Sequence, residues 1–329
     1  MVEWVEDAEL GAGYETFTIE LGDDPDGQGL IVATLVRSTR TPAARQGAAL
    51  YVHGFTDYFF QREMADYWVD RGFAFYALDL RKCGRSRREG QTPHYVSDLA
   101  LYDAELEVAL ATVRAESDDA PVVLSGHSTG GLILPLWLTR LQRRPGGSPG
   151  HGIAGLVLNS PWFDLQGAAW MRSLGTQLIR GVSRFRSLDE VRLPHTDSYG
   201  SSLHVSAHGE WEYNLEFKPM HGFPITYGWL NAVRRGQSVL HRGHDVGVPS
   251  LVLHSTRSWF SRVFGEKVVG SDAVLDVKQI ARWSGCLGNA VTVRPIPGAK
   301  HDVFLSPKPA REAAYSTIDA WLRDSALVG

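Results

Sequence analysis

A serine stands at the centre of the segment Gly126-His-Ser128-Thr-Gly130, which has the pattern Gly-x-Ser-x-Gly. A short apolar run precedes this segment and apolar residues at helical spacing follow it, which predicts a strand, a sharp turn and a helix. Glycines on either side let the strand end and the helix start approach closely, and the turn pushes the serine hydroxyl out above the sheet. This context favours Ser128 as a nucleophile over a serine in an ordinary tight turn.

A serine hydroxyl needs a base within hydrogen-bond reach, and the base needs an acid that orients it. The chain has 12 histidines, so position rather than composition must select the base. His301 follows the last predicted strand, at the sheet end where Ser128 lies, and completes the chain order Ser, Asp, His. The plainer alternative is a loop histidine that bonds its neighbour Asp302.

Two aspartates are candidates for the acid. Asp272 lies after the apolar run 249–254 and before the strand that leads to His301. Asp164 follows the preceding strand and could reach the same imidazole. The chain order of the motif favours Asp272, with Asp164 as the alternative.

The attack of a serine on a carbonyl generates an oxyanion, which preorganised donors must meet. The backbone N–H of Thr129, directly after Ser128, is one expected donor. The second is expected from the loop after the run 47–52, where Phe55 stands. His53 and Gly54 precede it, and we expect them to form a turn that brings this backbone close to the substrate.

These residues require a sheet that brings several strand ends together. Tyr14 to Leu21 and Leu30 to Val36 read as an antiparallel hairpin at one edge. Continuous apolar runs then alternate with helical patterns, which predicts an α/β fold with a mostly parallel central sheet flanked by helices. The predicted buried strands are 47–52, 73–78, 121–124, 153–158, 249–254 and 290–296.

The alternation stops between residues 165 and 240, where aromatic-rich helical stretches replace the buried strands. We therefore predict a helical cap, or lid, at 165–240 and a core domain made of 1–164 and 241–329. An insertion at the carboxyl end of a parallel sheet covers the crevice where ligands bind. The residues expected to contact substrate are His53, Gly54, Trp162, Trp211, Tyr213, Phe223 and Tyr227.

Composition excludes several other classes of protein. A net charge of -4 gives no nucleic-acid footprint in this chain of 329 residues. Cys83 and Cys286 form neither a disulfide framework nor a metal-site spacing. The first residues lack a signal peptide pattern, and no apolar run approaches a membrane span. We expect a cytoplasmic protein with no cofactor, no metal and no stable membrane insertion. The sequence leaves open whether the protein forms a homo-oligomer.

With these residues in hand, the chain resembles the α/β-hydrolase superfamily, and within it the monoacylglycerol lipase and lysophospholipase group near the serine aminopeptidases. The resemblance implies Ser128 as nucleophile, His301 as base, Asp272 as acid, and Phe55 and Thr129 as oxyanion donors. The length and layout are also similar to those of bacterial lactonases that open the mycotoxin zearalenone. The segments that carry the family resemblance are 53–55, 79–86, 126–130, 271–274 and 298–304.

We therefore predict a serine hydrolase that cleaves a carboxylic ester or lactone of a bulky hydrophobic substrate through an acyl-enzyme. One alternative is an aminopeptidase-like hydrolase, because Glu210, Glu212 and Glu216 could hold a free ammonium. Another is a non-catalytic α/β-hydrolase that binds a ligand, although no member of the expected triad is missing.

Overall fold

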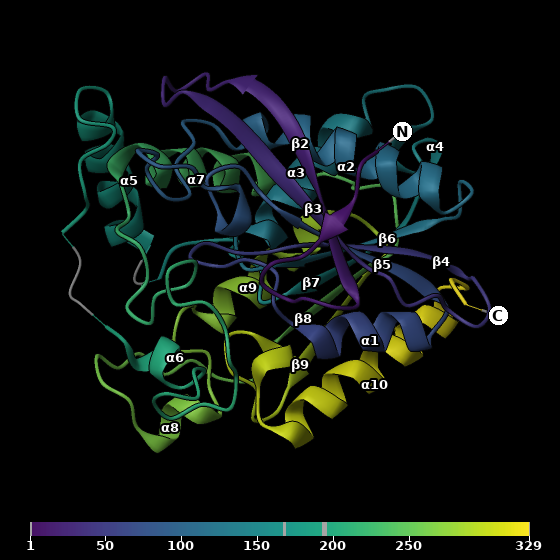
Figure 1. Cartoon of the computed structure of the whole chain (residues 1–329). Coiled ribbons are helices and arrows are strands. Elements are labelled where there is room, and N and C mark those ends of the chain that lie inside the picture. Colours follow the sequence, from purple (N-terminus) through teal and green to yellow (C-terminus); the bar gives the residue numbers. More distant parts are fainter. Residues whose placement is uncertain (1, 167–168, 193–195, 329) are drawn as a thin grey trace.

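The computed structural model of the chain describes residues 2–166, 169–192 and 196–328. Nine strands form one sheet in these ranges, in the order β1-β2-β3-β5-β4-β6-β7-β8-β9 (Figure 1). The strands are β1 Val5–Glu6, β2 Tyr14–Asp23, β3 Leu30–Ser38, β4 Gly47–Val52, β5 Phe73–Asp79, β6 Val122–His127, β7 Ile153–Asn159, β8 Ser250–Ser255 and β9 Val291–Ile296.

The sheet is antiparallel at one edge and parallel elsewhere. β1, β2 and β3 pair antiparallel, and β3 also pairs antiparallel with β5. From β5 across β4, β6, β7, β8 and β9 every pairing is parallel. The edge hairpin and the mostly parallel sheet of an α/β-hydrolase fold are thus confirmed. The carboxyl ends of β4, β6, β7, β8 and β9 consequently meet at one end of the sheet.

Helices follow most of the parallel strands, as the alternation of sequence patterns predicts. The helices are α1 Arg62–Asp70, α2 Asp103–Glu116, α3 Gly130–Leu141, α4 Gly147–Gly150, α5 Ala169–Ser183, α6 Ser198–Ser201, α7 Tyr227–Leu240, α8 Glu266–Val269, α9 Val277–Trp283 and α10 Lys308–Asp324. Short 3-10 turns are η1 Gly84–Ser86, η2 Leu99–Tyr102, η3 Ser284–Leu287 and η4 Val303–Leu305. None of the helices in the described ranges is long and apolar enough to cross a membrane.

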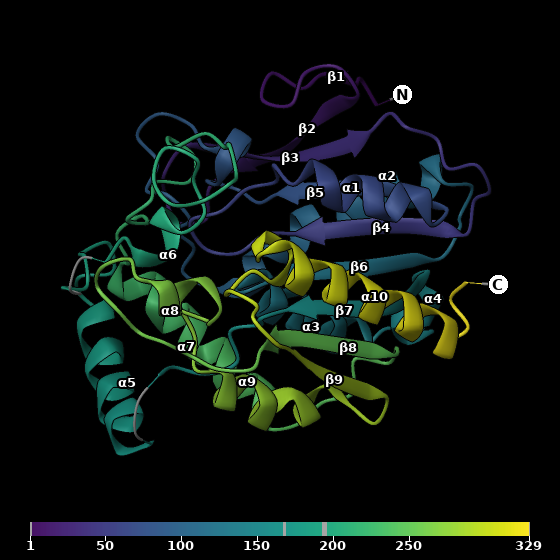
Figure 2. The ribbon, with the colours of Figure 1, turned by 90° about the horizontal axis from the view of Figure 1, so that it is seen from below.

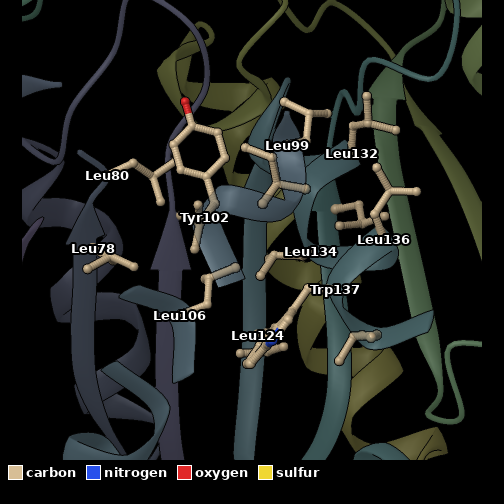
Figure 3. Close-up of a cluster of buried hydrophobic side chains, with 14 of the residues drawn as sticks. Leu78, Leu80, Leu99, Tyr102, Leu106, Leu124, Leu132, Leu134, Leu136 and Trp137 are labelled. Atoms are coloured by element: carbon tan, nitrogen blue, oxygen red, sulfur yellow. The ribbon is translucent and has the colours of Figure 1, made fainter. Parts of the chain in front are cut away.

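Helices cover both faces of the sheet, and this explains why every residue of β4 and β6 is buried. α1 and α10 lie on one face, as Figure 2 shows. α2 and α3 cover the other face, where Leu106 and Trp137 pack with Leu124 of β6 (Figure 3). Burying one such leucine contributes about 1.5–3 kcal/mol, so these two layers hold the strand ends rigidly in place.

The segment between β7 and β8 contains α5, α6 and α7 and has no strand of the central sheet in its described part. Figure 2 shows these helices gathered at the end of the sheet toward which the arrowheads of β4 and β8 point. α7 packs on both α5 and α3, so the helical cap rests on the helix that follows the serine. The limits 165 and 240 of this cap stay a prediction.

Candidate active site

Ser128 lies in the sharp turn between β6 and α3. Its φ of 52° falls in the left-handed region, which is costly for a residue with a Cβ atom. The Ser128 amide donates to the carbonyl of Asn159 at 3.0 Å, and its carbonyl accepts from the amide of Trp162 at 2.9 Å. A Cβ atom at Gly126 would lie 2.9 Å from the carbonyl oxygen of Gly130. The turn therefore needs glycine, and β7 holds it in its strained form.

His301 lies in the loop after β9 and is bonded to Asp272. Its Nδ1 is 2.9 Å from Oδ2 of Asp272, and both residues are buried. The imidazole ring lies 4.9 Å, centroid to centroid, from the ring of His127, the residue before Ser128. Because the carboxylate holds Nδ1, the Nε2 atom is left for a proton outside this pair.

Asp272 is fixed by its own backbone surroundings. Its second oxygen, Oδ1, accepts hydrogen bonds from the amides of Val274 at 2.8 Å and Leu275 at 2.7 Å. Two backbone hydrogen bonds to one oxygen hold the side chain in this orientation. Asp272 can therefore orient the imidazole without further support.

Asp164, the alternative acid, has other partners. Its Oδ1 is 2.7 Å from the guanidinium of Arg234 in α7, and its Oδ2 is 3.3 Å from the indole nitrogen of Trp283. This carboxylate thus links the segment after β7 to the cap helix α7. The structure brings His301 together with Asp272 and joins Asp164 to the cap.

The backbone amides of Phe55 and Thr129 are not used in the hydrogen bonds of the described residues. Neither amide donates a hydrogen bond to another described residue. Thr129 is also the N-cap of α3, so its N–H lies at the positive end of the helix dipole. Two free backbone donors beside a serine are the arrangement that an oxyanion would require.

A close approach of two backbones sets the position of Phe55. A Cβ atom at Gly54 would lie only 2.8 Å from the Cβ of Ser128, so this position needs glycine. His53 locks the turn, since its Nε2 accepts from the amide of Leu80 at 3.1 Å and its Nδ1 donates to the carbonyl of Gly54 at 2.7 Å. Burial lowers the pKa of His53, which keeps the imidazole neutral for these two bonds.

A buried ionic group contacts His127, the residue before Ser128. The Asp57 carboxylate is 3.1 Å from Nδ1 of His127 and 2.6 Å from Nζ of Lys218, a residue of the cap. Burial alone would raise the pKa of Asp57, but the Lys218 ammonium and then His127 outweigh it and hold that pKa well below its usual value. Asp57 is therefore an anion shared by the core and the cap.

A second buried carboxylate anchors the loop of His301. Asp302 accepts from the amides of Asn159 at 2.7 Å and Gln61 at 2.8 Å. The side-chain oxygen Oδ1 of Asn159 in turn accepts from the backbone N–H of Val303 at 3.1 Å. Because Asn159 also receives the Ser128 amide, one residue of β7 bonds both the serine turn and the histidine loop.

The aromatic residues predicted to contact substrate divide into groups. Phe55 packs on Trp229 at 4.1 Å between ring centroids, and Trp162 lies 5.7 Å from that same ring. Phe223 lies 5.5 Å from His94, whose ring also contacts Phe55. These rings form an apolar wall beside the backbone amide of Phe55.

The other predicted aromatics are placed elsewhere. Tyr213 and Trp211 belong to a separate cluster around Tyr58, Phe60 and Leu305. Tyr227 packs on the main core at the start of α7. Contact of Trp211, Tyr213 and Tyr227 with substrate stays a prediction.

Three residues of this region escaped sequence reasoning. Trp229 was one of many aromatics in the cap, and its pattern on α7 is that of an ordinary core residue. His94 and Lys218 stand in segments without periodicity, so nothing in the sequence signals that they converge on Phe55 and Asp57. No group of three or more His, Cys, Asp or Glu side chains capable of holding a metal occurs in the described parts of the chain.

Comparisons with solved structures agree with this architecture. The chain is similar to a soluble variant of monoglyceride lipase from Saccharomyces cerevisiae, at 14% identity and a TM-score of 0.65 over 99% of this chain and 95% of that chain. It is also similar to the monoacylglycerol lipase of Paleococcus ferrophilus, at 17% identity and a TM-score of 0.62 over 90% and 99%. A carboxyl esterase from Bacillus coagulans gives 15% identity and a TM-score of 0.64 over 94% and 99%. At these low sequence identities, the structural similarity establishes a shared fold alone.

No curated protein matches the sequence at significant similarity. The profile of the family described as Hydrolase_4, serine aminopeptidase S33, matches residues 43–305. That range includes the serine turn, the Asp272–His301 pair and the whole cap. The chain is therefore a member of the serine aminopeptidase S33 family and has the α/β-hydrolase fold.

Proposed function

We propose that the protein is a serine hydrolase of carboxylic esters or lactones, with Ser128 as nucleophile, His301 as base and Asp272 as acid. The observation that carries this proposal is the buried 2.9 Å contact between His301 and Asp272, at the sheet end where Ser128 is held in strained geometry. A histidine oriented in this way, beside a serine at a Gly-x-Ser-x-Gly turn, is the arrangement that activates a hydroxyl.

In the first half of the reaction, the Ser128 hydroxyl attacks the carbonyl carbon while Nε2 of His301 takes its proton. Asp272 keeps Nδ1 protonated and stabilises the imidazolium that forms. The amides of Phe55 and Thr129 donate to the oxyanion. His301 then protonates the leaving alcohol, which departs and leaves an acyl-enzyme on Ser128.

In the second half, His301 takes a proton from water, and the resulting hydroxide attacks the acyl-enzyme carbonyl. The same two amides stabilise the second oxyanion. Collapse of this intermediate returns the proton to Ser128 and releases the carboxylic acid. Cleavage of a lactone follows the same steps, except that the alcohol and the acid leave as one molecule.

Esters of a bulky hydrophobic acid or alcohol are the proposed substrates. Phe55, Trp229 and Trp162 supply apolar surface next to the oxyanion donors. The proteins of similar fold include two monoacylglycerol or monoglyceride lipases and a carboxyl esterase, which supports ester rather than peptide cleavage.

Aminopeptidase action, the meaning of the family's name, has less support. It requires acidic groups that hold the free ammonium of a peptide. Glu210, Glu212 and Glu216 are all exposed, and Glu210 is paired with Arg311. A carboxylate already paired at the surface is a poor receptor for a substrate ammonium.

A fluorophosphonate probe tests the proposal directly. Labelling of the wild type at Ser128, together with hydrolysis of p-nitrophenyl butyrate, is the expected result. Ser128→Ala should lose both, with an unchanged circular dichroism spectrum. Ester hydrolysis that persists in Ser128→Ala, or a wild type that takes no label, would overturn the proposal.

A further inference from the structure

A narrow pocket lies directly beside the proposed oxyanion donors. Its space is about that of one water molecule. Gly54 and Thr129 both line this pocket. A Cβ atom at Gly54 would lie 2.8 Å from the Cβ of Ser128, and Thr129 follows Ser128 in the chain, so the pocket lies close to the proposed nucleophile. The residues on its wall that matter here are Gly54, Phe55, Cys83, His94, Thr129 and Trp229.

Two polar atoms of this wall are buried without a hydrogen-bond partner among the described residues. They are Nε2 of His94 and Oγ1 of Thr129. His94 is 3% exposed and Thr129 is 4% exposed. Buried polar groups are nearly always satisfied in folded proteins, so two orphans on one pocket indicate that a ligand or water completes them.

The His94 ring is held firmly in its orientation. Its Nδ1 is 3.1 Å from Sγ of Cys83, and its ring packs 5.0 Å from Phe55 and 5.5 Å from Phe223. Burial lowers the pKa of His94 well below its usual value, and the nearby His53 lowers it further. A neutral imidazole with Nδ1 engaged has one remaining polar atom, Nε2, which donates or accepts according to the tautomer.

The distance between two atoms of Thr129 indicates how far the pocket lies from the reacting carbonyl. Its backbone nitrogen is a proposed oxyanion donor, and Oγ1 is three covalent bonds from that nitrogen. A substrate group that bonds Oγ1 while the carbonyl oxygen bonds the amide must therefore stand on the second or third carbon of the acyl chain.

We propose that this pocket binds a hydroxyl group on the acyl part of the substrate, at the carbon next to the carbonyl or one further. A hydroxyl matches the water-sized space, and it both donates and accepts, so it satisfies the Thr129 hydroxyl and either tautomer of His94. The inference rests on the proposed esterase activity and narrows it to hydroxy-acyl esters or lactones.

A pair of esters of equal shape tests this pocket. p-Nitrophenyl 3-hydroxybutyrate carries a hydroxyl where p-nitrophenyl 3-methylbutyrate carries a methyl group. We expect wild-type kcat/KM to be about tenfold higher or more for the 3-hydroxybutyrate than for the 3-methylbutyrate, because the 3-methylbutyrate leaves two buried polar groups unpaired. Thr129→Val and His94→Phe should each bring that ratio close to one.

Thr139→Val is the matched control on the same helix. Its hydroxyl bonds the carbonyl of Pro135, outside the pocket, so the ratio should stay at the wild-type value. A wild-type ratio near one, or variants that slow both esters equally, would mean that water alone fills the pocket and would overturn the inference. Failure to cleave either ester, with no labelling of Ser128, overturns the proposed function and this inference with it.

Discussion

The ammonium of Lys218 lies 2.6 Å from the carboxylate of Asp57, so a residue of the cap neutralises a buried anion in the loop that carries Phe55. The same loop receives a second bond from the cap, since the amide of Phe223 donates to Oγ1 of Thr56 at 2.9 Å. The cap therefore helps to fix one of the two proposed oxyanion donors.

Lys218→Met should destabilise the fold strongly. Removal of one partner of a buried ion pair leaves an uncompensated charge, which typically costs about 3–5 kcal/mol. Urea unfolding measures this loss. Lys308→Met is the matched control, because Lys308 pairs with Glu312 at the exposed surface, and it should change stability little. Adding Asp57→Asn to Lys218→Met should recover part of the loss; no recovery would show that the two side chains act independently.

Asp272→Asn should reduce kcat by about four orders of magnitude, as when the acid of such a triad becomes an amide that stabilises the wrong imidazole tautomer. Asp164→Asn should act mainly on stability, because Asp164 bonds Arg234 of α7. Steady-state hydrolysis of a p-nitrophenyl ester by both variants measures the difference. A larger loss of kcat in Asp164→Asn would make Asp164 the acid.

Gly54→Ala should lower kcat by about a hundredfold or more, the typical effect of removing one oxyanion donor. The new methyl group would meet the Cβ of Ser128 at 2.8 Å, so the loop or the serine turn must shift. Gly285→Ala offers a control, since a Cβ atom there has no neighbour within 4 Å among the described residues. Full activity in Gly54→Ala would exclude Phe55 as a donor placed by this close approach.

Lys300 should make stability depend on pH in the alkaline range. Its Nζ donates to the carbonyl of Ser202 in the cap at 2.6 Å, and burial lowers its pKa to about 8 from the usual 10.5. Between these two values the unfolded chain binds more protons than the folded one, so the free energy of unfolding rises with pH through this window.

Urea unfolding of the wild type and Lys300→Met at pH 7, 9 and 10.5 measures this effect. The wild type should gain stability relative to the variant as pH rises from about 8 to 10.5, because the buried amine no longer carries a charge. A difference between the two proteins that is constant over this range would contradict the pKa shift.

The sequence predicts well those features that local pattern determines. Apolar runs and turn residues are enough to predict the strand before Ser128 and the helix after it. They also predict the edge hairpin and the position of His301 after the last strand. α9 begins only at Val277, because the Asp276 side chain caps it by accepting from the amide of Lys278. Asp272 thereby stays in the loop, where its backbone bonds hold it toward His301.

Contacts between distant segments could not be predicted in this way. Lys218 and Asp57 are 161 residues apart, and the cap around Lys218 has no regular element in which periodicity could reveal an inward face. The pocket formed by His94 and Thr129 has the same origin, since two loops and one helix start converge there. The bond between Asp164 and Arg234 also joins segments far apart in the chain. The sequence could not reveal this partner, so Asp164 stood beside Asp272 as a candidate acid.

The ion pair between Lys218 and Asp57 limits how this protein can be re-engineered. The cap could be exchanged for that of another hydrolase as a route to new substrates. Such an exchange would remove Lys218, the one cationic side chain of the cap that contacts Asp57 among the described residues. A chimera that omits this lysine would keep Ser128, His301 and Asp272, and we expect it to lose activity because Phe55, the proposed oxyanion donor, would be misplaced. The cap and the catalytic core of this enzyme must therefore be redesigned together, as a single unit.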